Sequence, residues 1–125
     1  MVSQAMRCLD IEHLAHKPIS DLSGGQQQRA LIARALVQES SLFLLDEPLN
    51  ALDEATRTTV DAVLQRHTRQ GGTVLVATHD LGRLSESFDR VIYLREGRVE
   101  QIDNLSEVPR TAAPYASVYT SRAKI

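Results

Sequence analysis

The chain has 125 residues, of which 42% are hydrophobic and 24% charged, with a formal net charge of -2. This ordinary composition excludes a disordered, collagen-like or coiled-coil chain, and no apolar run approaches the roughly 20 residues that cross a bilayer. The first residues lack the apolar core of a signal peptide. The basic residues are scattered along the sequence and do not form the clustered basic patch that is typical of nucleic-acid binding. We therefore expect a soluble, cytosolic α/β domain whose single cysteine, Cys8, is a small buried apolar residue.

Hydrophobic periodicity predicts helices and strands in alternation. In chain order, the predicted elements are a helix over 2–16 broken around Asp10, a long helix over 25–38, a strand over 42–45, a helix from Asp53 that stops at Gly71, a strand over 73–77, a further helix, and a hairpin of 91–94 with 98–102. The strand–helix–strand unit predicts a parallel pair with a right-handed crossover, and both of its strands are expected to be buried on two faces. After Ser106 we expect a loosely held tail, because prolines interrupt it and periodicity is weak.

Two glycines stand in the first turn of the long helix, in the run Leu22-Ser23-Gly24-Gly25-Gln26. Ser23 with Gln26 fits a capping box, so the run can be no more than a helix start. Each glycine nevertheless costs about 1 kcal/mol of helix propensity relative to alanine. Glycine lets a ligand approach bare backbone, and a helix N-terminus offers free N–H groups to a phosphate. Phosphate binding and a plain cap are both open on these residues alone.

Two adjacent carboxylates, Asp46 and Glu47, end the strand over 42–45. Open α/β sheets bind their ligands at this end of their strands. Alternation along a strand places the two side chains on opposite sides, so they can do different work. One carboxylate can hold Mg²⁺, and the other can orient a water for attack on a phosphorus. For a lone Asp-Glu pair, solvated acids at a strand end are the simpler interpretation.

Two further motifs flank predicted elements. Asp53, at the end of Asn-Ala-Leu-Asp, is well placed as the N-cap of the next helix. His79, in Thr-His-Asp, follows the strand over 73–77, where a lone histidine is more often structural than catalytic. Beside a Mg²⁺–phosphate site, however, an imidazole can hydrogen-bond the terminal phosphate. The other histidines have no ligand spacing and are predicted to be incidental: His13, His16 and His67.

In this order, the motifs resemble the nucleotide-binding domain of ABC transporters. The matching runs are LSGGQQQR at 22–29, LFLLDEP at 42–48, ALD at 51–53 and TH at 78–79. In that family they are the signature motif, the Walker B strand, the D-loop and the switch histidine. The resemblance covers about residues 18–100. It implies a partial P-loop NTPase (RecA-like) core with parallel strands flanked by helices, plus part of the helical signature subdomain.

The resemblance also implies domain bounds and a role for each motif residue. Residues 1–104 correspond to a truncated nucleotide-binding domain, in which 1–40 end the signature subdomain and 41–104 form the later part of the ATPase core, and 105–125 are a C-terminal tail. Asp46 matches the Mg²⁺-associated carboxylate, Glu47 the general base, and His79 the histidine that senses the γ-phosphate. The remaining matches are Asp53 in the D-loop and Ser23, Gly24, Gly25 and Gln26 in the signature, which contacts ATP held by the opposite subunit.

For the family, the cofactors are ATP and Mg²⁺. The expected partners are membrane-spanning transporter subunits and a second nucleotide-binding domain in a dimer, and no nucleic acid. The chain is therefore expected in the cytoplasm, peripheral on the inner face of the cell membrane. The transported solute and its direction are not encoded in these motifs.

A P-loop requires G-x-x-x-x-G-K-[ST], and the lysines of this chain, Lys17 and Lys124, stand outside any such pattern. The chain thus resembles the C-terminal half of the domain, and we expect it to be inactive alone. A partial ABC transporter ATPase is the first hypothesis, and a non-catalytic short subunit that lends its signature to a partner's ATP is the alternative. An ABC-type DNA-maintenance ATPase is disfavoured, because heptad arms and a basic face are absent from the sequence.

In the family's sheet, the Walker A strand lies between the switch-histidine strand and the strand that matches 91–94. Without it, those two strands would lie roughly 10 Å apart, since adjacent strands are about 4.8 Å apart. Two unpaired apolar edges would be exposed. We therefore expect poor solubility of the chain alone, or a rearranged pairing.

Overall fold

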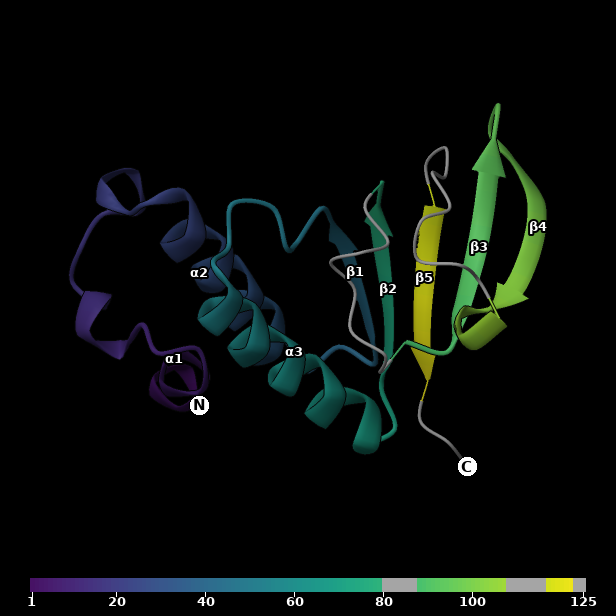
Figure 1. Ribbon diagram of the computed structural model, residues 1–125. Coiled ribbons are helices and arrows are strands. Elements are labelled where there is room, and N and C mark those ends of the chain that lie inside the picture. The colour runs from purple at the N-terminus through teal and green to yellow at the C-terminus, as the bar shows by residue number, and fades with distance from the viewer. Residues whose placement is uncertain (80–87, 108–116, 123–125) are drawn as a thin grey trace. The chain divides into compact units, whose positions relative to one another are not determined.

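The computed structural model describes residues 1–79, 88–107 and 117–122 (Figure 1). They divide into two compact units. The first comprises Met1–Ser40 with Leu49–Leu64, and the second Ser41–Pro48 with Gln65–Ile125. The further helix expected before the hairpin falls on residues 80–87, outside the described ranges. In the described part of the chain, no helix is long and apolar enough to cross a membrane.

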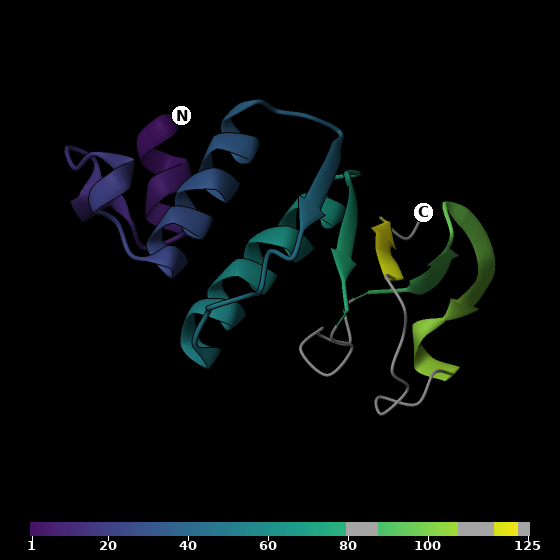
Figure 2. The same cartoon turned by 90° about the horizontal axis from the view of Figure 1, so that it is seen from above.

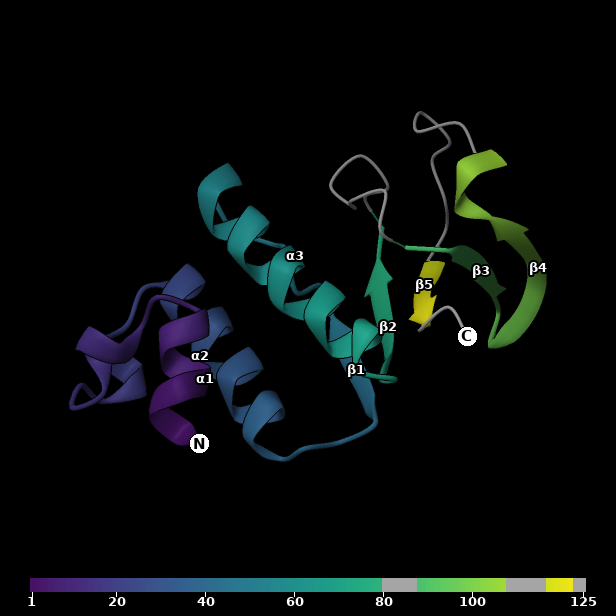
Figure 3. The same ribbon diagram turned by 90° about the horizontal axis from the view of Figure 1, so that it is seen from below.

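The first unit is helical. Its elements are α1 Val2–Cys8, the short 3-10 turns Glu12–Leu14 and Ile19–Asp21, α2 Gly24–Val37 and the first part of α3 Glu54–Arg69. α1 lies beside α2 (Figures 2 and 3). The expected break after the first helix is confirmed, because Asp10 adopts a left-handed conformation with φ 53°. Cys8 is half-buried rather than buried.

The second unit is a five-stranded sheet in the order β1-β2-β5-β3-β4 (Figure 1). Its strands are β1 Leu42–Asp46, β2 Thr73–Thr78, β3 Arg90–Arg95, β4 Arg98–Asn104 and β5 Ser117–Arg122. β1 and β2 are parallel, which confirms the predicted strand–helix–strand unit. The predicted hairpin of β3 and β4 is also confirmed. Glu96 and Gly97 make its turn with φ of 48° and 75°, the paired positive values that two-residue hairpins favour.

Between β2 and β3, the position expected to be empty is filled by β5 (Figure 1). β5 is antiparallel to both neighbours, so β2 and β3 run in the same direction with one strand between them. The expected alternative of a rearranged pairing is therefore confirmed. The expectation of a loosely held tail after Ser106 is wrong for β5, which pairs with two strands. Backbone N–H and C=O groups on two open strand edges are satisfied by any extended segment within reach, whatever its periodicity.

The prediction that the strand over 42–45 is buried on both faces is wrong. Phe43 is 3% exposed, whereas Leu44 is 75% exposed. The buried residues of the neighbouring strands, Val74, Val76 and Val91, are in register with the Phe43 side of the sheet. Among the described residues of this unit, the core therefore lies against one face only.

His67, predicted to be incidental, packs on that buried face. Its ring stacks on Phe43 with centroids 3.8 Å apart and planes 5° from parallel. A Cβ at Gly72 would lie 2.2 Å from Nε2 of His67, so the ring occupies the space that any larger residue at 72 would need. His67 is a packing residue, and it explains why the second of the two glycines after α3 is a glycine.

Candidate functional site

The first turn of α2 is a capping box, as predicted. The hydroxyl oxygen of Ser23 accepts from the backbone N–H of Gln26 at 3.3 Å, and the Gln26 side chain accepts from the Ser23 backbone N–H at 3.0 Å. This reciprocal pair fixes where the helix begins and leaves Gly24 and Gly25 in its first turn. Ser23 and Gly24 are exposed, and Gly25 and Gln26 are half-buried.

The fold itself gives no reason for glycine at 24 or 25. Neither residue has a positive φ. A Cβ at Gly24 would meet nothing nearer than 4.0 Å, and a Cβ at Gly25 would lie 3.4 Å from the Leu52 side chain and 3.5 Å from the Ala51 carbonyl oxygen, which are ordinary contacts. Alanine would fit at both positions and would favour the helix by about 1 kcal/mol each. The glycines therefore keep backbone uncovered without serving the packing of this unit.

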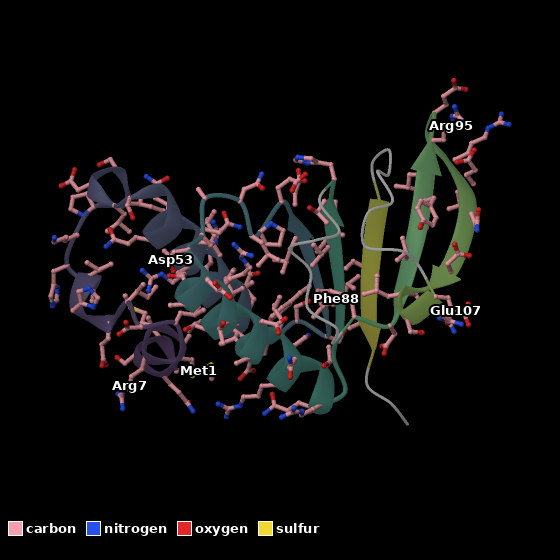
Figure 4. All side chains as sticks on the ribbon, in the orientation of Figure 1. Met1, Arg7, Asp53, Phe88, Arg95 and Glu107 are labelled. Carbon is pink, nitrogen blue, oxygen red and sulfur yellow. The ribbon has the colours of Figure 1, made fainter. Side chains whose placement is uncertain are left out.

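Asp53 caps α3, as predicted, and Figure 4 shows it where that helix begins. Its carboxylate accepts from the Thr56 backbone N–H at 2.7 Å. The hydrogen bonds from the backbone and side chain of Thr56 lower the pKa of Asp53, because they stabilise the ionised form. The residue two positions earlier, Ala51, has φ 59° and lies against Gly25. Within the first unit, the structure thus brings the predicted signature and D-loop segments together.

Two residues that the sequence analysis gave no role support this loop. The Gln27 amide donates to the carbonyl oxygens of Ile19 and Leu22, both at 3.1 Å, and so anchors the turn that precedes the glycines. The Arg29 guanidinium donates to the Leu9 carbonyl at 3.1 Å and to the Asp10 carbonyl at 3.3 Å. The Leu9 and Asp10 carbonyls lie beyond the end of α1, and polar residues spaced along a helix give no sequence signal for such partners.

Glu47 leaves the sheet directly after β1. Its φ of 44° is left-handed, and its backbone N–H donates to the Ala77 carbonyl oxygen at 2.8 Å. The alternation argument therefore holds for Asp46, the last residue of β1, but not for Glu47, whose side chain is directed by a turn. The conformation places the Glu47 carboxylate at the end of β2.

Three donors meet the Glu47 carboxylate there. The Thr78 hydroxyl donates to one oxygen at 2.9 Å, and the His79 backbone N–H donates to the other at 3.2 Å. Nδ1 of His79 contacts that second oxygen as well. The structure thus brings two predicted residues together and adds Thr78, whose place in the predicted Thr-His motif was its only sequence signal.

Partial burial raises the pKa of Glu47, but the hydrogen bonds from His79 and Thr78 and the nearby His79 charge outweigh it and lower the pKa overall. The carboxylate is therefore ionised at neutral pH. The His79 side chain is 70% exposed, and that of Glu47 is 29% exposed. An ionised carboxylate can take a proton from a bound water, and the exposed imidazole beside it can contact a second ligand atom.

Asp46 is exposed at the end of β1. Among the described residues, no three histidine, cysteine or acidic side chains gather into a metal cage. A single accessible carboxylate nevertheless suits Mg²⁺, which is commonly held by one or two carboxylates together with waters and substrate phosphates. Asp46 thus fits a magnesium bound mainly through a nucleotide. Asp46, Glu47 and His79 lie in the second unit, and the Ser23–Gln26 loop and Asp53 lie in the first.

The sequence is similar to that of ABC transporter proteins. The family model described as ABC transporter matches residues 1–50. The cobalt import ATP-binding protein CbiO of Salmonella typhimurium is 41% identical over 98 residues, which are 78% of this chain and 36% of that protein. The manganese transport system ATP-binding protein MntB of Halalkalibacterium halodurans is 36% identical over 120 residues, 96% of this chain and 44% of that protein.

The fold is similar to solved ABC cassettes. The dimeric structure of MJ0796, a bacterial ABC transporter cassette, matches with a TM-score of 0.71 and 38% identity over 82% of this chain and 46% of that one. A post-hydrolysis state of the same cassette, bound to ADP and Pi, matches with a TM-score of 0.73 and 36% identity over 82% and 44%. The chain thus spans less than half the length of each of these relatives.

Proposed function

This chain belongs to the family of ABC transporter ATP-binding domains, and we propose that it supplies two parts of their ATP site: the signature loop and the hydrolytic carboxylate. The loop is Ser23–Gln26, and the carboxylate is that of Glu47. The phosphates of the ATP would be bound by a P-loop, a motif that the 125 residues do not contain.

The first turn of α2, which has two glycines without side chains, supports the proposed role of the signature loop. Gly24 and Gly25 are required neither by backbone conformation nor by packing, yet they lower helix propensity. A ligand that must touch backbone is the remaining physical reason for them, and free N–H groups at a helix N-terminus favour phosphate. In the proposed complex, the loop contacts the phosphates of an ATP held by a second ATP-binding domain.

The Glu47 cluster supports the second part. Its carboxylate is ionised, held by Thr78 and His79, and partly open to solvent. In the proposed site, Glu47 orients and deprotonates the attacking water, and the exposed His79 ring contacts the terminal phosphate. Asp46 would hold Mg²⁺, which would neutralise part of the charge on the phosphates. Asp53, which already caps α3, lies at the segment that faces the dimer partner.

The proposed partners follow from the relatives, whose names describe a cobalt import protein and a manganese transport system. We propose that the domain works with membrane-spanning transporter subunits and a second ATP-binding domain, on the cytoplasmic face of the membrane. A non-catalytic subunit that lends only its signature would not need the Glu47 cluster. The ordered carboxylate therefore favours a part in hydrolysis over that alternative.

The test is a chimera in which this chain replaces the matched segment of MntB, so that the protein regains a full-length ATP-binding domain. We expect phosphate release from Mg²⁺–ATP, and at least a hundredfold loss of it in Gly25→Asp, because a carboxylate at the bare turn repels phosphate. Gln70→Asp adds the same charge at an exposed position after α3 and should leave the rate unchanged. Equal rates in wild type and Gly25→Asp would overturn the role of the loop.

A further inference from the structure

The Gln27 side chain reaches back from α2 to the segment that precedes the helix. Its amide nitrogen donates to the carbonyl oxygens of Ile19 and Leu22, both at 3.1 Å. Ile19–Asp21 is a 3-10 turn, and Leu22 is the extended residue that ends it, with ψ 146°. Gln27 therefore binds the turn at its first residue and again just beyond its last. These two bonds fix the path by which the chain enters Ser23.

This turn is weak by itself. A 3-10 turn has poorer hydrogen-bond geometry than an α-helix, and the backbone bond that closes this one runs from the Leu22 N–H to the Ile19 carbonyl oxygen at 3.2 Å. The backbone of Gln27, by contrast, lies within α2, where its N–H donates to the Ser23 carbonyl oxygen at 2.8 Å. The helix thus holds the Gln27 amide in place, and the amide holds the turn.

The two partners of the Gln27 amide require a donor at position 27. Both are carbonyl oxygens, which only accept, and an amide NH₂ group carries two donors and can satisfy both. A glutamate has nearly the same shape, but its ionised carboxylate has no donor and would place an oxygen against the two carbonyls. Glutamine and glutamate also have similar helix propensities. Exchanging one for the other therefore removes the two hydrogen bonds and leaves the propensity for α2 almost unchanged.

The segment that Gln27 holds leads directly into the capping box and the two glycines after it. We propose that Gln27 is a positioning residue of the signature loop, which keeps Leu22 and Ser23 where the first turn of α2 can meet an ATP held by a second domain. The proposal rests on the proposed function, in which that turn contacts phosphate. A displacement of about 1 Å in a group that positions a substrate can cost about a hundredfold in rate.

The first test compares phosphate release by variants of the MntB chimera. We expect Gln27→Glu to release phosphate at least about tenfold more slowly than wild type, because repulsion between the carboxylate and the two carbonyls displaces the loop. Gln27→Met, which has a similar length and no donor, should change the rate in the same direction. Gln70→Glu adds the same charge at an exposed position after α3 and should keep the wild-type rate. A wild-type rate in Gln27→Glu would overturn the proposal.

Mixing two chimeras separates positioning from folding. In the proposed dimer, each site combines the Glu47 of one domain with the signature loop of the other. Mixed dimers of Gln27→Glu and Glu47→Gln therefore contain one site with both parts intact, and we expect release at least about twofold faster than by either variant alone. A Gln27→Glu protein that does not fold cannot be rescued in this way. Absence of rescue, where Gly25→Asp mixed with Glu47→Gln is rescued, would overturn the proposal.

Hydrogen exchange in the 125-residue chain tests the same contact without ATP. We expect the Leu22 amide, which is bonded within the turn, to exchange at least about fivefold faster in Gln27→Glu than in wild type. The amide of Val60, which is buried on α3, should exchange at the same rate in both. Unchanged exchange at Leu22 would overturn the proposal. Faster exchange at Leu22, with no rescue in the Gly25→Asp mixture, would instead contradict the proposed function alone.

Discussion

Glu47 and His79 follow two adjacent parallel strands, and their side chains meet just beyond the strand ends. The same Glu47 oxygen that contacts Nδ1 of His79 also accepts from the His79 backbone N–H at 3.2 Å. The position of the carboxylate therefore depends on the β1–β2 register, in which Asp46 pairs with Ala77. A slip of one residue would separate the acid from the imidazole.

This contact predicts how the Glu47 carboxyl titrates. Its pKa lies below the ordinary 4.5 because donors from His79 and Thr78 outweigh partial burial. We expect His79→Ala and Thr78→Val each to raise the pKa of Glu47, with the larger change in His79→Ala. Carboxyl-carbon NMR titration measures both. An unchanged pKa in His79→Ala would contradict the account of the cluster.

The same lowered pKa predicts an acid-dependent stability difference. A carboxyl whose folded pKa is depressed stabilises the fold above its unfolded pKa, near 4.5, and this contribution disappears as the pH falls through the folded pKa. The stability advantage of wild type over Glu47→Gln should therefore shrink below pH 4.5. Urea unfolding at pH 5.5 and pH 3 compares the two proteins. An advantage that grows as the pH falls would reverse the sign and contradict the account.

Gly72 should not tolerate alanine. A Cβ there would lie 2.2 Å from the His67 ring, which is itself stacked on Phe43, so the ring cannot move freely. We expect Gly72→Ala to lower the free energy of unfolding by about 1–3 kcal/mol, as overpacking does. In a His67→Ala background the cost should largely disappear, and denaturant unfolding of the four proteins gives the coupling.

Gly71→Ala is the matched control. Gly71 has φ 95° and open space around its Cβ position, so alanine there costs backbone strain that is independent of His67. His67→Ala should leave the cost of Gly71→Ala unchanged. A cost of Gly72→Ala that is equally insensitive to His67 would show that the clash is relieved elsewhere.

Local patterns predicted much of this chain. The capping box at Ser23, the Asp53 cap, the β1–β2 parallel pair and the β3–β4 turn each depend on residues close in sequence or on a single period. The meeting of Glu47 with His79 could be expected only in outline, since parallel strands end at one sheet edge. The left-handed φ of Glu47 could not be read from the sequence, because glutamate has no preference for it.

The other failures are non-local. Leu42–Leu45 is an apolar run that reads as buried on both faces, but burial depends on what covers the sheet, and among the described residues Leu42 and Leu44 are exposed. β5 has no apolar run of its own and is a strand because β2 and β3 offer unpaired edges. Helical spacing predicts only that His67 lies on α3. Its packing role depends on contacts with Phe43, which precedes α3 in the sequence, and with Gly72, which follows it.

β5 should protect the chain from aggregation. Its backbone pairs with β2 on one side and β3 on the other, so removing it exposes two strand edges. We expect Val118→Pro, which removes a backbone donor in a central strand, to raise light scattering and abolish cooperative melting. Val118→Thr keeps the N–H and the β-branch and should behave as wild type. A soluble, cooperatively melting Val118→Pro variant would show that β5 is dispensable.

The 125-residue chain should not bind ATP on its own. A P-loop binds the phosphates of ATP through its backbone amides and its lysine, and the sequence contains no such motif. Asp46 and Glu47 would also repel a polyphosphate in the absence of Mg²⁺. Calorimetric titration with Mg²⁺–ATP should give no heat of binding up to millimolar nucleotide. Saturable binding that Gly25→Asp abolishes would reveal a phosphate cradle within the chain.

We propose that Glu47 is the hydrolytic carboxylate of an ATP site that another polypeptide completes. Phosphate release by the MntB chimera, compared between wild type and Glu47→Gln, distinguishes this role from a structural one. We expect Glu47→Gln to retain ATP binding and to lose at least a hundredfold in the rate of release, because the amide cannot accept the proton of water. Release at the wild-type rate in Glu47→Gln, with ATP still bound, would contradict the claim.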